Sequence, residues 1–99
     1  VYLCCVANYD SARVEIFIDQ GDYQKNRAIY KRLEQNRDAI EVAYGKSLNW
    51  VCQDDVRACK VYDEIKEVSI KNEEDWPVMS AFHIQRAKAL LVATKQFLA

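Results

Sequence analysis

Two groups of charged residues in the second half of the chain have the composition of a hydrolytic metal site. Asp54 and Asp55 are adjacent, and the run Glu64-Ile65-Lys66 follows them. In metal-dependent nucleases, acidic side chains hold a divalent cation and a lysine on the following strand helps to position or polarise the attacking water. The candidate catalytic residues are therefore Asp54, Asp55, Glu64 and Lys66, with a divalent metal as the only cofactor. An acid-x-Lys triplet is also expected about once by chance in such a chain, so solvated charge near a strand end is the simpler interpretation.

Other catalytic and cofactor-binding patterns are missing. His83 is the only histidine, no Cys-x-x-Cys pair occurs, and no serine stands in a Gly-x-Ser-x-Gly turn. We therefore expect no metal site outside the nuclease alternative, and we interpret His83 as a helix residue whose ring is hydrogen-bonded. Gly21 and Gly45 are the only glycines. Without a glycine-rich loop to hold phosphates, no nucleotide cofactor is expected.

A cluster of basic residues follows Gly21 and is interleaved with Tyr23 and Tyr30. Cations and aromatic rings in this arrangement can bind phosphates and stack on bases. The alternative is a solvated helix face with internal ion pairs, such as Arg37 with Glu41 at i,i+4 spacing. The candidate nucleic-acid-binding residues in the whole chain are Arg13, Lys25, Lys31, Arg32 and Arg57.

Composition sets limits on these interpretations. The 99 residues carry 14 basic and 15 acidic side chains, so the chain lacks the overall basic charge of many nucleic-acid-binding domains. The four cysteines, Cys4, Cys5, Cys52 and Cys59, show no framework spacing, and we expect reduced thiols and a cytoplasmic location. No signal peptide or membrane-spanning run is present in the printed sequence, so no membrane partner is expected.

Hydrophobic periodicity predicts strands in both halves of the chain. Residues 1–7 are apolar and are predicted to form a buried strand, and residues 13–19 alternate as a half-buried strand does. The polar turn between them predicts an antiparallel hairpin. Residues 48–52 and 57–62 are predicted to form two more strands, and residues 66–70 a short fifth one.

Two amphipathic helices complete the predicted fold. The first is expected to begin after Asp22, which is a good N-cap, and to end at Gly45, which suits the left-handed residue after a helix. The second is expected to begin near Asn72, with Pro77 in its first turns. The order β-β-α-β-β-(β)-α predicts an α+β fold with a mostly antiparallel sheet and both helices packed on one face. Residues 1–99 are expected to form a single domain, and both ends resemble cuts within a longer protein.

Several short motifs, taken in order, resemble a known family. They are Ala12-Arg13-Val14-Glu15-Ile16-Phe17-Ile18-Asp19, Leu48-Asn49-Trp50, Asp54-Asp55-Val56-Arg57-Ala58 and Glu74-Asp75-Trp76-Pro77. Together they are similar to the prokaryotic family of domain of unknown function 4268 and cover nearly the whole chain. This resemblance implies a C-terminal module, often placed after a region that resembles PD-(D/E)xK nucleases. The family tends to have a basic residue where Val56 stands and a serine where Cys59 stands.

Three functional hypotheses follow. The first is an accessory module of a DNA-processing or defence-related protein that binds nucleic acid or mediates self-association. The second is a metal-dependent PD-(D/E)xK-like nuclease. The third is a purely structural protein-interaction domain, in which the broad apolar stripe of the last helix exceeds what the sheet can cover.

Overall fold

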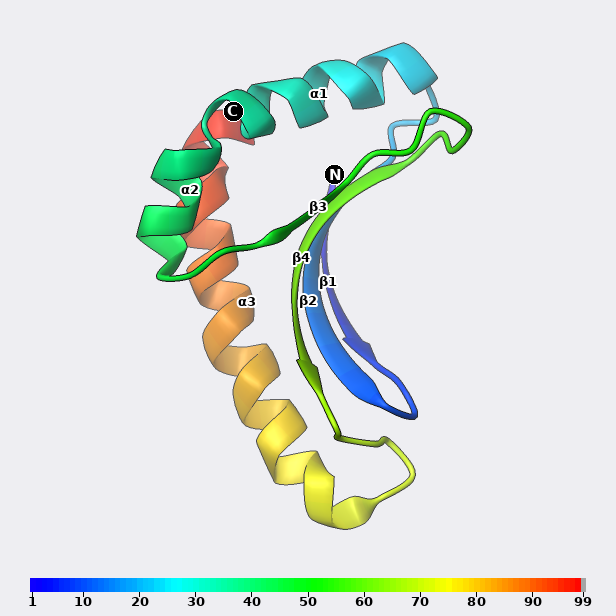
Figure 1. Cartoon of the computed structure of the whole chain (residues 1–99), viewed down its shortest axis with the longest axis vertical. Coiled ribbons are helices and arrows are strands. Elements are labelled where there is room, and N and C mark those ends of the chain that lie inside the picture. The colour runs from blue at the N-terminus through cyan, green and yellow to red at the C-terminus, as the bar shows by residue number, and fades with distance from the viewer. Residues whose placement is uncertain (99) are drawn as a thin grey trace.

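One four-stranded sheet carries α2 and α3 along one face, with α1 lying across one end (Figure 1). The computed structural model describes residues 1–98. The elements are, in chain order, β1 (Tyr2–Ala7), β2 (Ser11–Ile18), α1 (Tyr23–Gln35), α2 (Arg37–Tyr44), β3 (Asn49–Val51), β4 (Cys59–Lys66), the short 3-10 helix η1 (Glu73–Asp75) and α3 (Trp76–Leu98).

The sheet is antiparallel throughout, with the strand order β1-β2-β4-β3. Alternation along β2 explains why only one face carries helices. Val14, Ile16 and Ile18 are at most 1% exposed and pack under the helices, whereas Arg13 and Phe17 point to the opposite face. The predicted α+β class, with a mostly antiparallel sheet and one helical layer, is confirmed.

The predicted fifth strand does not form. Strand β4 pairs with the whole length of β2, from Ile18 opposite Cys59 to Ser11 opposite Lys66. Beyond Lys66 no residue of β2 remains to pair with, so the chain turns away. Glu67 has a positive φ of 62°, and its N–H donates to the carbonyl of Asp10 in the β1–β2 turn.

The predicted first helix is two helices. Asn36 interrupts it with a non-helical backbone, and its N–H donates to the carbonyl of Leu33 at the end of α1. The bend redirects α2 along α3. Both predicted caps are confirmed, because the Asp22 side chain accepts from the N–H of Lys25 and Gly45 has a left-handed φ of 100°.

The predicted burial of the first strand is wrong. Strand β1 lies at the edge of the sheet, where Tyr2 is 62% and Leu3 is 38% exposed. An uncharged apolar sequence is typical of a buried central strand, but here β2 and β4 occupy the two central positions.

Helix α3 supplies much of the core. Leu90 is fully buried, and Met79, Phe82 and Ala93 pack in the same cluster as the β2 residues. Pro77 is the second residue of the helix, as predicted. The ring of His83 is hydrogen-bonded, also as predicted, because its Nε2 lies 3.0 Å from the carbonyl oxygen of Val6 and must donate to it.

Two adjacent leucines test this packing. Leu90 is fully buried and Leu91 is 44% exposed. We expect Leu90→Ala to lower the free energy of unfolding by about 2–5 kcal/mol, because it leaves a cavity against the sheet. Leu91→Ala, the matched control, should lower it by less than about 1 kcal/mol. Urea denaturation measures both values, and equal losses would contradict the orientation of α3.

Candidate functional site

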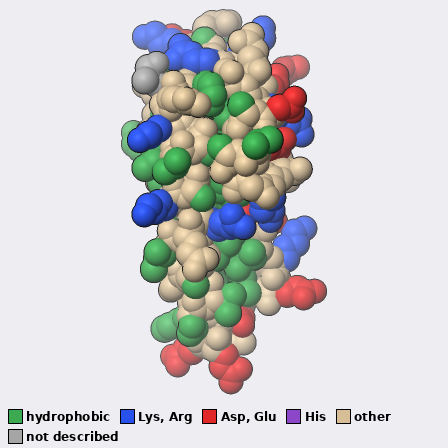
Figure 2. Space-filling model, turned by 90° about the vertical axis from the view of Figure 1, so that its left-hand side faces the viewer, with side chains coloured by type: hydrophobic (Ala, Val, Ile, Leu, Met, Phe, Trp, Pro, Cys, Tyr) green, Lys and Arg blue, Asp and Glu red, His purple; other side chains and the backbone are tan. Residues whose placement is uncertain are grey.

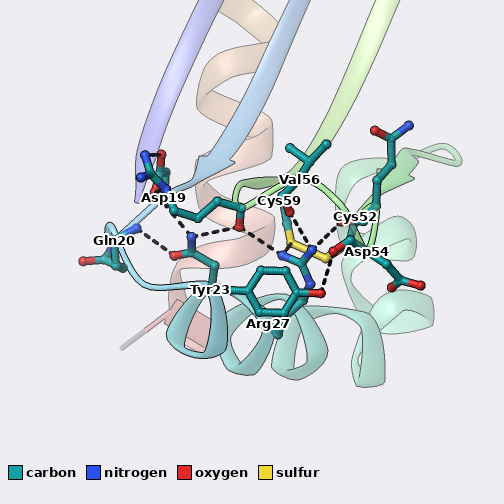
Figure 3. The surroundings of a disulfide bond; sticks show 11 residues. Asp19, Gln20, Tyr23, Arg27, Cys52, Asp54, Val56 and Cys59 are labelled. Carbon is teal, nitrogen blue, oxygen red and sulfur yellow. Dashed lines mark hydrogen bonds and ion pairs between the residues drawn. A yellow bond between two sulfur atoms is a disulfide. The ribbon is translucent and has the colours of Figure 1, made fainter.

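A disulfide closes the loop between β3 and β4 at the end of the sheet that α1 crosses (Figure 3). The β3–β4 register places Val51 opposite Lys60, so Cys52 and Cys59 come next and face each other, with Cα atoms 4.5 Å apart. The prediction of four reduced thiols is therefore wrong for this pair. Cys4 and Cys5 are free.

Asn26 fastens this loop to the rest of the fold. Its side chain is fully buried in the first turns of α1. The Oδ1 atom accepts from the N–H of Gln20 at 2.7 Å, and Nδ2 donates to the carbonyl of Arg57 at 3.0 Å and to Asp19 Oδ1 at 3.3 Å. One amide thereby joins the end of β2, the start of α1 and the β3–β4 loop.

Arg27 reinforces the same junction. Its guanidinium donates to three backbone carbonyls of the loop and to Cys59 Sγ at 3.1 Å. It also stacks 3.9 Å from the ring centroid of Tyr23, whose hydroxyl donates to the carbonyl of Asp54. Figure 3 shows Arg27 directed toward the loop. These contacts use the N–H donors of the guanidinium, so Arg27 stabilises the β3–β4 loop.

A charged pair borders the junction on the exposed side. Arg57 binds Asp19 through two hydrogen bonds, from Nε to Oδ1 at 3.0 Å and from Nη2 to Oδ2 at 2.8 Å. The hydrogen bond from Arg57 is the main reason that the pKa of Asp19 falls to about 2, with help from the N–H of Gly21. Asp19 is therefore ionised at neutral pH and holds the loop through Arg57.

A groove of about 480 Å³ runs between α1 and this loop. Its walls are aromatic and of mixed charge, with Lys31 beside Glu34 and Asp54. Burial, with help from the Glu34 carboxylate, raises the pKa of Tyr30 to about 12, so its hydroxyl remains protonated at neutral pH. The groove offers stacking surfaces and one lysine, and it contains no nucleophile paired with a base.

The candidate catalytic residues are spread over the sheet. Asp54 and Asp55 lie in the β3–β4 loop. Glu64 lies well along β4, at the position opposite Arg13 of β2 in the strand register. At about 3.3 Å per residue, the five steps from Cys59 to Glu64 span roughly 17 Å. Lys66 lies still further away, opposite Ser11. Within residues 1–98, no group of acidic, histidine or cysteine side chains is arranged to hold a metal ion.

The candidate nucleic-acid-binding residues also separate. Arg57 is held by Asp19, as described above. Arg13 lies on the helix-free face of the sheet, 3.8 Å from Glu15 and over the ring of Tyr62. Lys25, Lys31 and Arg32 are exposed on α1. At about 100° per residue, Lys25 and Arg32 share one side of the helix and Lys31 faces the groove.

Two structural features had no signal in the sequence. Glu15 alternates to the helix-free face, yet it is only 7% exposed because neighbouring side chains cover it. Asp63 lies under the helices, where it accepts from the Tyr44 hydroxyl at 2.6 Å and pairs with Lys46 at 3.1 Å. Burial and the Asp63 carboxylate raise the pKa of the Tyr44 hydroxyl. Cross-strand neighbours cover Glu15, whereas residues at and just after the end of α2 bind Asp63, so both carboxylates depend on the tertiary fold.

The fold and this junction define a small α+β domain with a one-sided antiparallel sheet. The family model described as Domain of unknown function (DUF4268) matches residues 1–98, and the chain belongs to that family. The searches of curated proteins and of solved structures gave no match. No helix in the described part of the chain is both long and apolar enough to cross a membrane.

The role of Asn26 in this junction can be tested by replacing its amide nitrogen with an oxygen. Asn26→Asp keeps the acceptor for Gln20 but loses the donor to Arg57 and buries a charge beside Asp19. We expect the free energy of unfolding to fall by about 2–4 kcal/mol. Asn49→Asp is the control, because its amide donates to Tyr62 at an exposed site. It should cost less than about 1 kcal/mol in urea denaturation, and a similar cost for both would contradict the role of Asn26.

Proposed function

We infer that the chain is a non-catalytic accessory module that acts by self-association. The observation that carries this proposal is the set of large apolar side chains that the fold leaves exposed on two elements. Tyr2 and Leu3 of β1 are 62% and 38% exposed, and Ile84 and Val92 of α3 are 74% and 58% exposed. Figure 2 displays the outer side of the helical layer, where hydrophobic side chains lie among lysines and arginines. Exposed apolar surface of this kind is typical of interaction sites.

Charge favours a second copy as the partner. With 14 basic and 15 acidic residues, the net charge is −1, so two copies repel each other only weakly. Proteins with a net charge near zero associate more readily than highly charged ones.

The wider context is also part of the proposal. The resemblance described above supports a C-terminal module of a DNA-processing or defence-related protein of a prokaryote. The expected cytoplasmic location rested on four reduced thiols, and the Cys52–Cys59 disulfide removes two of them from that argument. A module of this kind needs no active site of its own. The separation of Asp54, Asp55, Glu64 and Lys66 gives the nuclease alternative no support.

The mass of the chain in solution tests self-association. We expect sedimentation equilibrium to give a concentration-dependent mass that approaches twice the 11.5 kDa of one chain. A monomeric mass up to about millimolar concentration, where even weak specific pairs form, would overturn the proposal.

Nucleic-acid binding through α1 is the second candidate. Lys25, Lys31 and Arg32 are exposed there, and Tyr23 and Tyr30 line the adjoining groove. If this face binds a short DNA duplex, fluorescence anisotropy should show the affinity falling by more than about tenfold between about 50 mM and about 200 mM salt. The variant with Lys25→Glu and Lys31→Glu should lose that affinity, and Lys88→Glu on α3 should retain it. Absence of binding at the lower salt concentration would exclude this candidate.

A further inference from the structure

We propose that the free edge of β1 pairs antiparallel with β1 of a second copy, joining two four-stranded sheets into one across a two-fold axis. The inference rests on the proposed self-association and names the surface that performs it.

The two edges of the sheet differ in the protection they carry. Strand β3 is only three residues long, which limits pairing at that edge. Strand β1 has six residues, contains neither a charged residue nor proline, and pairs with β2 without a bulge. Proteins usually protect such edges with lysine, proline, a bulge or a covering segment. Strand β1 therefore has the features of an edge that receives another strand.

The hairpin determines which backbone groups face outward. The N–H of Asn8 donates to the carbonyl of Ser11, so this pair is hydrogen-bonded within the hairpin. In an antiparallel ladder, hydrogen-bonded and non-hydrogen-bonded pairs alternate. Leu3, Cys5 and Ala7 consequently direct their N–H and C=O groups away from β2, toward the free edge.

Side chains above this edge are apolar and uncovered. Leu3 and Cys5 lie on the helical side of β1, and both are exposed. His83 of α3 reaches the carbonyl of Val6. Ile84 and Leu91 lie about 100° and 80° beyond His83 around α3, on the side turned away from the core, and both are exposed. A second sheet joined at β1 places another copy beside this flank, which buries these residues.

Symmetry restricts the register of the new pair. The two-fold axis of a continuous sheet is perpendicular to it, so residues that face each other across the axis lie on the same face. Strand residues alternate between faces, so Cys4 can lie opposite another Cys4 but never opposite Cys5. Val1 immediately precedes β1, and continuing the alternation of the strand directs its backbone groups to the same free edge. Among the described residues, centring on Cys4 pairs the outward groups of Val1, Leu3, Cys5 and Ala7, whereas centring on Cys5 leaves Val1 without a partner. The register centred on Cys4 forms more hydrogen bonds and is the one we propose.

A lysine on the edge strand tests the surface. Leu3→Lys should raise the dissociation constant of the dimer at least about tenfold in sedimentation equilibrium, because it brings desolvated charge into the joined sheet. Val42→Lys makes the same kind of change at an 82% exposed position of α2 and should leave the dissociation constant unchanged. Circular dichroism and urea denaturation verify that both variants fold.

Cross-linking tests the register without disturbing the fold. In the proposed register the two Cys4 residues form a non-hydrogen-bonded pair, with Cα atoms about 4.5 Å apart, which a disulfide can span. Cys5→Ser retains Cys4, and Cys4→Ser retains Cys5. Burial, Glu15 and Cys5 raise the pKa of the Cys4 thiol, so the oxidation uses oxidised glutathione at about pH 9. We expect a covalent dimer on non-reducing gels for Cys5→Ser and not for Cys4→Ser.

The outcomes separate this inference from the proposed function. A monomeric wild-type chain would overturn both. A dimer that Leu3→Lys does not weaken would overturn the β1 interface while self-association stands. A dimer that cross-links through Cys5 in place of Cys4 would overturn the proposed register.

Discussion

The buried side chain of Asn26 is the constraint on which the α1 end of the molecule depends. Its three hydrogen bonds fix the end of β2, the first turns of α1 and the loop between β3 and β4. A buried amide that is fully bonded rigidifies its surroundings, because leaving either polar atom unpaired is costly. Arg27 and the Cys52–Cys59 disulfide then hold the loop from the other side. Of the residues that the sequence suggested for nucleic-acid binding, Tyr23 and Arg57 are thus occupied in holding this junction together.

The one-sided sheet is the second organising feature. Because β2 alternates strictly, one face takes the helices and the other keeps Arg13, Glu15 and Phe17. With β2 and β4 in the centre, the most apolar strand, β1, is left at the edge with one row of backbone groups unpaired within the described chain. Burial of apolar strand sequence is normally achieved by central placement. Here a second copy would supply that burial, which connects the fold to the function we propose.

The chain belongs to the family described as Domain of unknown function (DUF4268), so the functional hypotheses are distinguished by the geometry alone. Acidic residues that suggested a metal centre are separated by the length of β4, and two of the five basic candidates, Arg13 and Arg57, are paired with carboxylates. The exposed apolar residues of β1 and α3 are the large features that no internal role accounts for. A module that acts by self-association, as we propose, requires no more than such a surface.

The sequence by itself determined the α+β class, the hairpin, the helix caps at Asp22 and Gly45 and the buried face of β2, because each depends on local periodicity or on one residue's backbone preference. It did not reveal the break at Asn36, the loss of the fifth strand or the exposure of β1. The loss of the fifth strand and the exposure of β1 depend on how many partners each strand finds, and the break at Asn36 depends on the packing of α2 against α3. Only the tertiary structure paired Cys52 with Cys59, because the register of β3 on β4 brings the two residues opposite each other. It also placed Asn26, Glu15 and Asp63 among their neighbours, because those contacts join different strands, helices and loops.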